Sequence, residues 1–446
     1  MQRRQMLALT VLVALLAAAA TPADAEQPRT QESGEGAGRH EGRPSGLETF
    51  HARLRSFRAG TGKRLTIVQI GDSHTAADQF TARLRTRFQA EFGDGGRGML
   101  APGVPESYWR PAGVRATQKG VWRVQSMGRN DEAYGAFGLS GYIVRGANAG
   151  DTMELTVTDS EASFAVASIG FLTREKGGHV EVLIDGIPHA TLATDAKGPT
   201  YRRVEVAAAS GKGKQLTLKL VGDAPVDLAD WGLHSDQRGV ELIAHGFVGA
   251  QVKILDRWSA DITANQLKLL DPALIILAFG TNEGYAPASH LTDYADLLRA
   301  RVLALQRMAP NASIVILAGP DANRIPSYCP GTAALRDRAP CVPLTPAEAA
   351  DYDTRLARKD AELCRWHTPA SYAIVRGAQR HVANTLGLLL WDWMGYQGGV
   401  CAASAWHAKD WVHNDRVHLK REGANRSADA FYDELLRGLR THGGSR

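Results

Sequence analysis

The sequence of 446 residues contains only four cysteines, and none of them belongs to a Cys-x-x-Cys pair. The lack of that spacing argues against a structural zinc site. The four are Cys329, Cys341, Cys364 and Cys401, all in the C-terminal third. In an oxidising compartment they can form two disulfides in any of three pairings. We favour Cys329–Cys341 with Cys364–Cys401, and four free thiols remain an alternative.

Beyond its N-terminus the sequence lacks any apolar run long enough to span a bilayer. Residues 1–25 carry two positive charges near their start, Arg3 and Arg4. An apolar stretch shorter than a membrane span follows, and the segment ends in a small-x-small triplet at Ala25. This order is typical of a secretory signal peptide, with an uncleaved N-terminal anchor as the alternative. Residues 26–47 hold almost no large apolar side chain, which predicts a flexible leader.

Dense blocks of lysine and arginine are also missing, although the formal net charge is +5. Nucleic-acid-binding proteins gather such residues on one face, so we expect no nucleic-acid partner. With no spanning segment after the N-terminus, we further expect an exported protein without stable membrane insertion.

Short apolar runs then predict strands that are buried on both faces, as in a parallel sheet covered by helices. They occupy residues 65–70, 240–247, 273–279, 312–318 and 386–393. Helical patterns lie between most of them. One such pattern follows the first run and places an aromatic-rich stripe on one face, which we assign to core packing. These alternating elements predict an α/β domain built from residues 48–103 and 239–446.

Residues 104–238 interrupt that pattern with runs in which Val, Thr and Leu alternate with polar residues. Alternation is typical of antiparallel sheet with one wet face, so we predict an inserted β-sandwich. A purely structural insert and a carbohydrate-binding module both remain open, because aromatic rings can stack on sugars or fill a core. The aromatic residues concerned are Tyr108, Trp109, Trp122, Tyr134, Phe137, Tyr142 and Trp231.

Polar motifs follow the predicted strands of the α/β domain. They read GDSH at 71–74, HGFVGAQ at 245–251, GTNEG at 280–284 and GPDAN at 319–323. Ligands of open α/β sheets bind beyond the carboxyl ends of the strands, so these motifs should face one another. Near the C-terminus, Asp415 and His418 are spaced so that one side chain can hydrogen-bond the other.

These residue types suit acyl transfer. The Ser73 hydroxyl needs a base to become a nucleophile, and His418 can take its proton while Asp415 holds the imidazole in the right tautomer. An oxyanion requires hydrogen-bond donors, and the backbone N–H groups of Ser73 and Gly249 and the side-chain amide of Asn282 are candidates.

Each residue also has a structural explanation. Ser73 and Asn282 can cap helices, Gly249 can be a turn glycine, Asp415 can pair with Arg416 on the surface, and His418 can be a structural histidine. The ordered set after strand ends favours the catalytic interpretation over these separate ones.

The motif blocks GDSH, FVGAQ, GTNE and DRVH resemble those of SGNH (GDSL-type) hydrolases. The resemblance covers about residues 48–100 and 240–440. It implies a three-layer, flavodoxin-like α/β domain with a parallel sheet, in which Ser73 is the nucleophile, His418 the base and Asp415 the orienting acid. It also implies an oxyanion hole of Ser73, Gly249 and Asn282.

GDSH followed by TAAD, together with GTNE, is most similar to the exported peptidoglycan O-acetylesterases that carry an inserted β-domain. The resemblance implies a serine esterase that removes O-acetyl groups from a cell-envelope polysaccharide, with O-acetylated peptidoglycan favoured. It implies no cofactor and no metal. A wall-directed enzyme with four cysteines favours the periplasm, with release from the cell as the alternative.

Three other functions remain open at this point. They are an esterase for another acetylated polysaccharide, a polysaccharide O-acetyltransferase, and a non-catalytic wall-binding protein. The intact Ser73–Asp415–His418 set argues against the last of these.

The match has local departures. Arg416 stands where many relatives have glycine, and its side chain is expected to narrow the cleft or to contact an anionic substrate. Gly246 is the alternative to Gly249 in the short glycine block. His74 directly follows the serine, and we interpret it as an orienting or loop residue rather than the base.

Overall fold

The structure is a computed structural model that describes residues 46–128, 136–331 and 339–441. The predicted signal peptide and nearly all of the predicted leader lie outside the described residues. Among the residues that are described, no helix has both the length and the apolar character needed to cross a membrane.

A five-stranded parallel sheet forms the centre of the α/β part. Its strands in spatial order are β13 (Gly239–Gly246), β1 (Arg64–Gly71), β14 (Leu274–Phe279), β15 (Ser313–Ala318) and β16 (Leu389–Trp391). In chain order this is 2-1-3-4-5, the flavodoxin-like arrangement, whose ligand crevice lies where the order reverses beside the first strand. The predicted parallel sheet is confirmed, and the reversal lies between β1 and β14.

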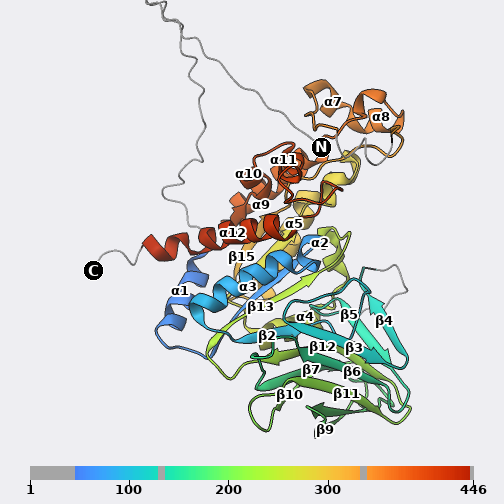
Figure 1. Cartoon of the computed structure of the whole chain (residues 1–446), viewed down its shortest axis with the longest axis vertical. Coiled ribbons are helices and arrows are strands. Elements are labelled where there is room, and N and C mark those ends of the chain that lie inside the picture. Colours follow the sequence, from blue (N-terminus) through green and yellow to red (C-terminus); the bar gives the residue numbers. More distant parts are fainter. Residues whose placement is uncertain (1–45, 129–135, 332–338, 442–446) are drawn as a thin grey trace, which may run out of the picture. The chain divides into compact units, whose positions relative to one another are not determined.

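Helices cover both faces of this sheet, giving three layers. On one face, apolar side chains pack from α1 (Glu48–Arg58), α3 (Gln79–Phe92) and α12 (Arg421–Thr441). On the other face they pack from α4 (Ala260–Leu270), α5 (Tyr294–Met308) and α9 (Ser371–Leu386). Figure 1 shows α3 in light blue beside α12 in red, and their aromatic residues meet where Phe88 packs edge-on against Tyr432.

Short helical segments lie in the connections that follow the strands of this sheet. They are α2 (Ser73–Ala76), η1 (Val252–Arg257), η2 (Glu283–Tyr285), η3 (Ala288–His290), α7 (Pro346–Ala350), α8 (Tyr352–Ala357), η4 (Ala361–Leu363), α10 (Trp393–Gln397) and α11 (Ala402–His407).

The remaining strands form two antiparallel sheets around a separate apolar core, as the alternating pattern predicts. One sheet has the order β10 (Tyr201–Ala207), β7 (Val166–Leu172), β12 (Val226–His234), β5 (Tyr142–Gly146), β4 (Trp122–Ser126), with β2 (Gly96–Leu100) also paired to β12. The other has the order β3 (Val114–Lys119), β6 (Thr152–Val157), β11 (Gln215–Val221), β8 (His179–Ile184), β9 (Ile187–Ala193). Figure 1 shows these strands in green and cyan.

Buried polar contacts join the sandwich to the α/β part. Gln266 of α4 is fully buried; its amide donates to Asp230 of β12 at 2.9 Å and its carbonyl accepts from the Leu139 N–H at 2.7 Å. A second contact joins His234 of β12 to Glu241 of β13, 2.7 Å apart. Buried polar groups are costly without partners, so these contacts fix the sandwich against the α/β part instead of leaving it as a separately tethered module.

The disulfide pairing that we favoured from the sequence is wrong. The structure pairs Cys329 with Cys364 and Cys341 with Cys401. The reason is the path of the chain, because Arg324 pairs with His367 in an antiparallel bridge and brings residue 329 to residue 364. Cys341 then lies beside Trp366 and reaches Cys401 at the start of α11.

Candidate active site

The serine of GDSH begins α2, directly after the end of β1, in a segment that we call the nucleophile turn (residues 71–76, which include α2). Gly71 ends β1 in a position where a Cβ atom would come within 2.5 Å of the Ala278 carbonyl oxygen, so a side chain does not fit there. Asp72 caps α2, its carboxylate accepting from the His74 N–H at 3.0 Å. Ser73 is therefore the first residue of the helix and not its cap, and its hydroxyl is available for another partner.

That partner is His418, which is 345 residues away in the sequence. The Ser73 Oγ lies 2.9 Å from His418 Nε2, and His418 Nδ1 lies 2.7 Å from Asp415 Oδ2. The structure thus brings together the three residues that the sequence predicted as nucleophile, base and orienting acid, in the connected order that acyl transfer requires.

Asp415 also shapes the segment that carries the histidine, which we call the histidine loop (residues 413–418). Its Oδ1 accepts from the backbone N–H groups of Val417 at 2.9 Å and His418 at 3.0 Å. Burial raises the pKa of Asp415, but the hydrogen bonds and charge of His418 and the Val417 N–H outweigh it and lower the pKa to about 2. The carboxylate is therefore ionised at neutral pH.

The predicted oxyanion donors come from the ends of β13 and β14. Gly249 has φ +74°, a conformation that favours glycine. Within the described residues the N–H groups of Ser73 and Gly249 meet no backbone acceptor. The Asn282 side chain makes no helix cap; it donates one hydrogen bond to the Ala250 carbonyl at 2.8 Å, which leaves its second amide hydrogen. All three residues lie in the described part of the chain, and no hydrogen bond joins Ser73 to Gly249 or to Asn282.

Gly246, the alternative glycine, has a packing role. A Cβ atom there would lie 2.0 Å from the Ala76 nitrogen, so the missing side chain lets β13 pack against α2. The nucleophile turn therefore depends on Gly246 for its position.

Sequence reasoning missed Glu283, the last residue of GTNE. Its buried carboxyl accepts from the Val252 N–H at 2.7 Å and the Gly280 N–H at 3.1 Å, which joins the segment after the glycine block to the end of β14. Burial, partly offset by these hydrogen bonds, raises the pKa of Glu283 to about 7. The signal available was a carboxylate directly beside the candidate oxyanion asparagine.

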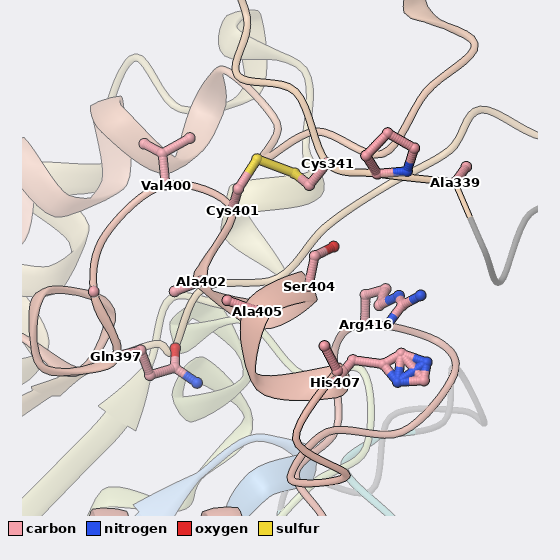
Figure 2. A pocket seen from close by; sticks show the side chains of 13 residues that line it. Ala339, Cys341, Gln397, Val400, Cys401, Ala402, Ser404, Ala405, His407 and Arg416 are labelled. Carbon is pink, nitrogen blue, oxygen red and sulfur yellow. A yellow bond between two sulfur atoms is a disulfide. The ribbon is translucent and has the colours of Figure 1, made fainter. Parts of the chain in front are cut away.

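Arg416 has φ +57° and is 5% exposed, which shows why a glycine is suited to this position. Its guanidinium lies 5.5 Å from the Trp366 ring. It lines a cavity of about 630 Å³ beside the Cys341–Cys401 disulfide, as Figure 2 shows together with Ser404 and His407. Arg416 thus borders a hollow next to the histidine loop, on the side of α11.

The aromatic residues of the sandwich divide into two groups. Trp231, Phe137 and Tyr142 are buried at 5% exposure or less and fill cores, so their rings are not available to a sugar. Tyr108 is 50% exposed, and Trp122 is partly buried against the sandwich core. Trp109 lines a cavity of about 20 Å³ with Thr75 and Ala76 of α2. Tyr134 lies outside the described residues. The sandwich therefore borders the nucleophile turn directly.

Metal ligands show no comparable grouping. Across the parts of the chain that the structure describes, no three His, Cys, Asp or Glu side chains are placed to hold a metal ion.

The flavodoxin-like sheet, the residues at its strand ends and the connected Ser73, His418 and Asp415 define a serine esterase of the SGNH (GDSL-type) class. No protein-family model matches the chain, and no curated protein matches it. Among solved structures, the chain is similar to a peptidoglycan O-acetylesterase, with 26% identity and a TM-score of 0.69 over 88% of this chain and 96% of that one.

Two further solved structures are more distant. One is a family two carbohydrate esterase from Clostridium thermocellum bound to cellohexaose, with 11% identity and a TM-score of 0.28 over 72% of this chain and 99% of that one. The other is a GDSL-like lipase from Parabacteroides merdae, with 17% identity and a TM-score of 0.29 over 45% and 74%. The assignment to the SGNH class therefore rests on the similarity to the peptidoglycan O-acetylesterase and on the geometry of the site.

Proposed function

We propose that this protein removes O-acetyl groups from a cell-envelope polysaccharide, with O-acetylated peptidoglycan as the favoured substrate. The observation that carries the proposal is the connected geometry of Ser73, His418 and Asp415, with contacts of 2.9 and 2.7 Å. The similarity to a peptidoglycan O-acetylesterase along nearly the whole of both chains supports the choice of substrate.

In the proposed reaction the Ser73 Oγ attacks the carbonyl carbon of the acetyl ester while His418 Nε2 takes the hydroxyl proton. Asp415, ionised and bonded to Nδ1, stabilises the resulting imidazolium. When the tetrahedral intermediate collapses, the bond to the sugar oxygen breaks and His418 returns its proton to that oxygen. A water molecule, deprotonated by His418, then attacks the carbonyl carbon of the acetyl-enzyme. The bond between that carbon and Ser73 Oγ breaks, His418 returns the proton to Oγ, and acetate leaves.

The negative oxygen of each tetrahedral intermediate needs donors that are already in position. We assign this role to the Ser73 N–H, the Gly249 N–H and the second amide hydrogen of Asn282. The Asn282–Ala250 hydrogen bond supports the assignment, because it ties the amide to the segment that carries Gly249. Loss of one donor of this kind typically costs about 3 kcal/mol in the barrier.

Hydrolysis is favoured over transfer to a sugar by the exposure of the site. The side chains of His418 and Asp415 are 44% and 47% exposed, so water reaches the base directly. A transferase has to keep water from the same acyl-enzyme.

An exported location is consistent with the two disulfides, since such bonds persist in oxidising compartments. We place the enzyme in the periplasm, where the polysaccharide would be within reach.

The test is acetate release from purified O-acetylated peptidoglycan by the wild type, Ser73→Ala, and a control variant Ser289→Ala at an exposed serine on η3. We expect release by the wild type and the control, and none by Ser73→Ala. Peptidoglycan stripped of its acetyl groups by mild base should yield none with any protein.

Two results would separate the parts of this proposal. Cleavage of an aryl acetate without release from peptidoglycan would keep the Ser73 chemistry and reject the substrate. Full activity of Ser73→Ala would reject the nucleophile itself.

A further inference from the structure

His74, directly after the candidate nucleophile, lies between the two halves of the site. It is 7% exposed and its ring centroid lies 5.5 Å from that of His418. Its Nε2 lies 3.1 Å from the Val417 carbonyl oxygen on the histidine loop, and its Nδ1 lies 3.3 Å from Asp72 Oδ1 on the nucleophile turn. The side chain thus bridges segments that are 343 residues apart in the sequence.

The partners of its two ring nitrogens decide its protonation state. A backbone carbonyl oxygen only accepts hydrogen bonds, so Nε2 must carry a hydrogen. Asp72 Oδ1 also accepts from the His74 N–H at 3.0 Å. A neutral ring with hydrogen on Nε2 would turn the lone pair of Nδ1 toward the Asp72 oxygen, so this pair of contacts favours a second hydrogen on Nδ1, which makes the ring an imidazolium.

The charges around the ring favour the same state. Burial lowers the pKa of His74, but the hydrogen bond and charge of Asp72, the Val417 carbonyl and the charge of Asp415 outweigh it and raise the pKa above its ordinary value. The other groups that face the ring are the imidazole of His418 and the indole of Trp393, the latter 5.7 Å away between centroids.

The carbonyl that His74 contacts belongs to Val417, the residue directly before His418 in the histidine loop. The N–H of the same residue, Val417, donates to Asp415, which in turn orients His418. A shift of Val417 would therefore move both members of the Asp415–His418 pair relative to Ser73. Misplacement by about 1 Å can cost about 10²-fold in rate.

We propose that His74, as an imidazolium bonded to Asp72, is a positioning residue that holds the Val417 carbonyl and so keeps His418 Nε2 within hydrogen-bonding distance of Ser73. This rests on the proposed function of Ser73, His418 and Asp415. The tie is complete while the ring is charged. It weakens as the pH rises through the raised pKa of His74, so the rate should fall on the alkaline side.

A matched pair of variants separates the contact made by Nε2 of His74 from the contact made by Nδ1. In His74→Gln the side-chain amide can still donate to the Val417 carbonyl from the place of Nε2, without the charge. In His74→Asn the amide reaches only the position of Nδ1, so the contact to Asp72 is kept and the contact to Val417 is lost.

We would measure kcat, KM and the pH profile of aryl acetate cleavage for these proteins, per folded molecule, with thermal melts as the folding control. His74→Asn should lose about 10²-fold in kcat with KM little changed. His74→Gln should stay within about tenfold of the wild type and lose the alkaline fall, since no charge remains to titrate. Equal losses in both variants would overturn the positioning role.

Nitrogen-15 NMR of the histidine side chains tests the protonation state without any activity. The signals of His74, identified by their absence from the spectrum of His74→Gln, should lose the second nitrogen proton only at a pH above the ordinary pKa of histidine. A ring that is already neutral below that pH would overturn the proposal. Failure of acetate release from peptidoglycan, by contrast, would leave both the NMR result and the aryl acetate result standing.

Discussion

The side chains of Asp72 and His74 in the nucleophile turn are 3% and 6% exposed, whereas those of Asp415 and His418 in the histidine loop are 47% and 44% exposed. The nucleophile turn is fixed by the core, because Gly71 and Gly246 let β1, β13 and α2 approach where no side chain would fit. The histidine loop is held by hydrogen bonds.

Those hydrogen bonds come from several directions. The His413 N–H donates to the His418 carbonyl at 2.8 Å, and the Asn323 N–H donates to the Arg416 carbonyl at 3.0 Å. Asp415 adds its contacts within the loop. The comparison therefore predicts that changes in the loop reduce activity with little effect on stability, whereas changes in the turn affect stability as well.

Replacing His418 by alanine should give the largest difference between the loss of activity and the loss of stability. We expect kcat to fall by about 10⁴-fold or more, because the base is lost. The melting temperature should hardly change, because a half-exposed side chain is removed. His413→Ala, at an exposed histidine of the same loop, is the control and should keep its activity. A large fall in the melting temperature of His418→Ala would contradict the prediction that changes in the loop leave stability nearly unchanged.

Asp415→Asn should lower kcat by about 10³- to 10⁴-fold. The Asn oxygen can still accept from the Val417 N–H, so the loop should stay folded, but its NH₂ group would face His418 Nδ1 and favour the wrong tautomer. Steady-state kinetics would measure the loss. Asp410→Asn, at an exposed aspartate with φ +62°, is the control. Activity close to that of the wild type would remove Asp415 from the proposed mechanism.

Asp78 tests the other side of the comparison, the effect on stability, because it is 7% exposed and follows the nucleophile turn. Its carboxylate accepts from Arg85 at 3.1 Å and from Arg97 at 2.9 Å. Burial raises the pKa of Asp78, but the two guanidinium groups outweigh it and lower the pKa to about 2. A lowered folded-state pKa stabilises the fold above the ordinary pKa, and this contribution is lost as the pH falls toward about 2.

Asp78→Asn should therefore cost about 3–5 kcal/mol of unfolding free energy, since two buried cations lose their counter-charge. Asparagine tolerates the φ of +49° found here, so the change isolates the charge. Urea unfolding would measure this loss of stability. The activity of the variant would be measured at low temperature, on the fraction that is folded. Asp256→Asn, in an exposed pair with Arg301, should cost at most about 1 kcal/mol. Equal losses of unfolding free energy in Asp78→Asn and Asp256→Asn would show that the buried position of Asp78 does not matter.

The parts of this architecture that the sequence predicted depend on local patterns. Apolar runs gave the parallel strands within a few residues, since a strand covered on both faces can hold few polar side chains. The residues after those strands pointed to the site, because the carboxyl ends of parallel strands lie at one edge.

The missed features depend on the path of the chain. Asp72 caps α2 where Ser73 was a candidate cap, and which of two adjacent polar residues does so depends on where the turn ends. Glu283 accepts from the Val252 N–H, a partner that only the fold brings near. His74 was interpreted as an orienting or loop residue, but its contact with the Val417 carbonyl could not be read from the sequence. The disulfides are the clearest case, because cysteines close in sequence were separated by the crossing of residues 324 and 367.

The disulfides also give the finest test of how the histidine loop is held. Cys401 N donates to Thr368 Oγ1, Thr368 contacts Asp321 and Asn323, and the Asn323 N–H holds the Arg416 carbonyl. A path of hydrogen bonds thus leads from the Cys341–Cys401 disulfide to the histidine loop. The Cys329–Cys364 disulfide crosslinks the antiparallel crossing instead.

Replacing either cysteine pair by serine should cost about 2–4 kcal/mol, and the longer loop of 60 residues against 35 should cost only about 0.5 kcal/mol more. Only Cys341→Ser/Cys401→Ser should also lower kcat per folded molecule, by a few-fold, because it loosens the support of Arg416. Urea unfolding and steady-state kinetics on both double variants, with non-reducing peptide mapping of the wild type, would measure this. Equal kcat values would show that the loop is held without the disulfide, by its own hydrogen bonds and the contact from His74.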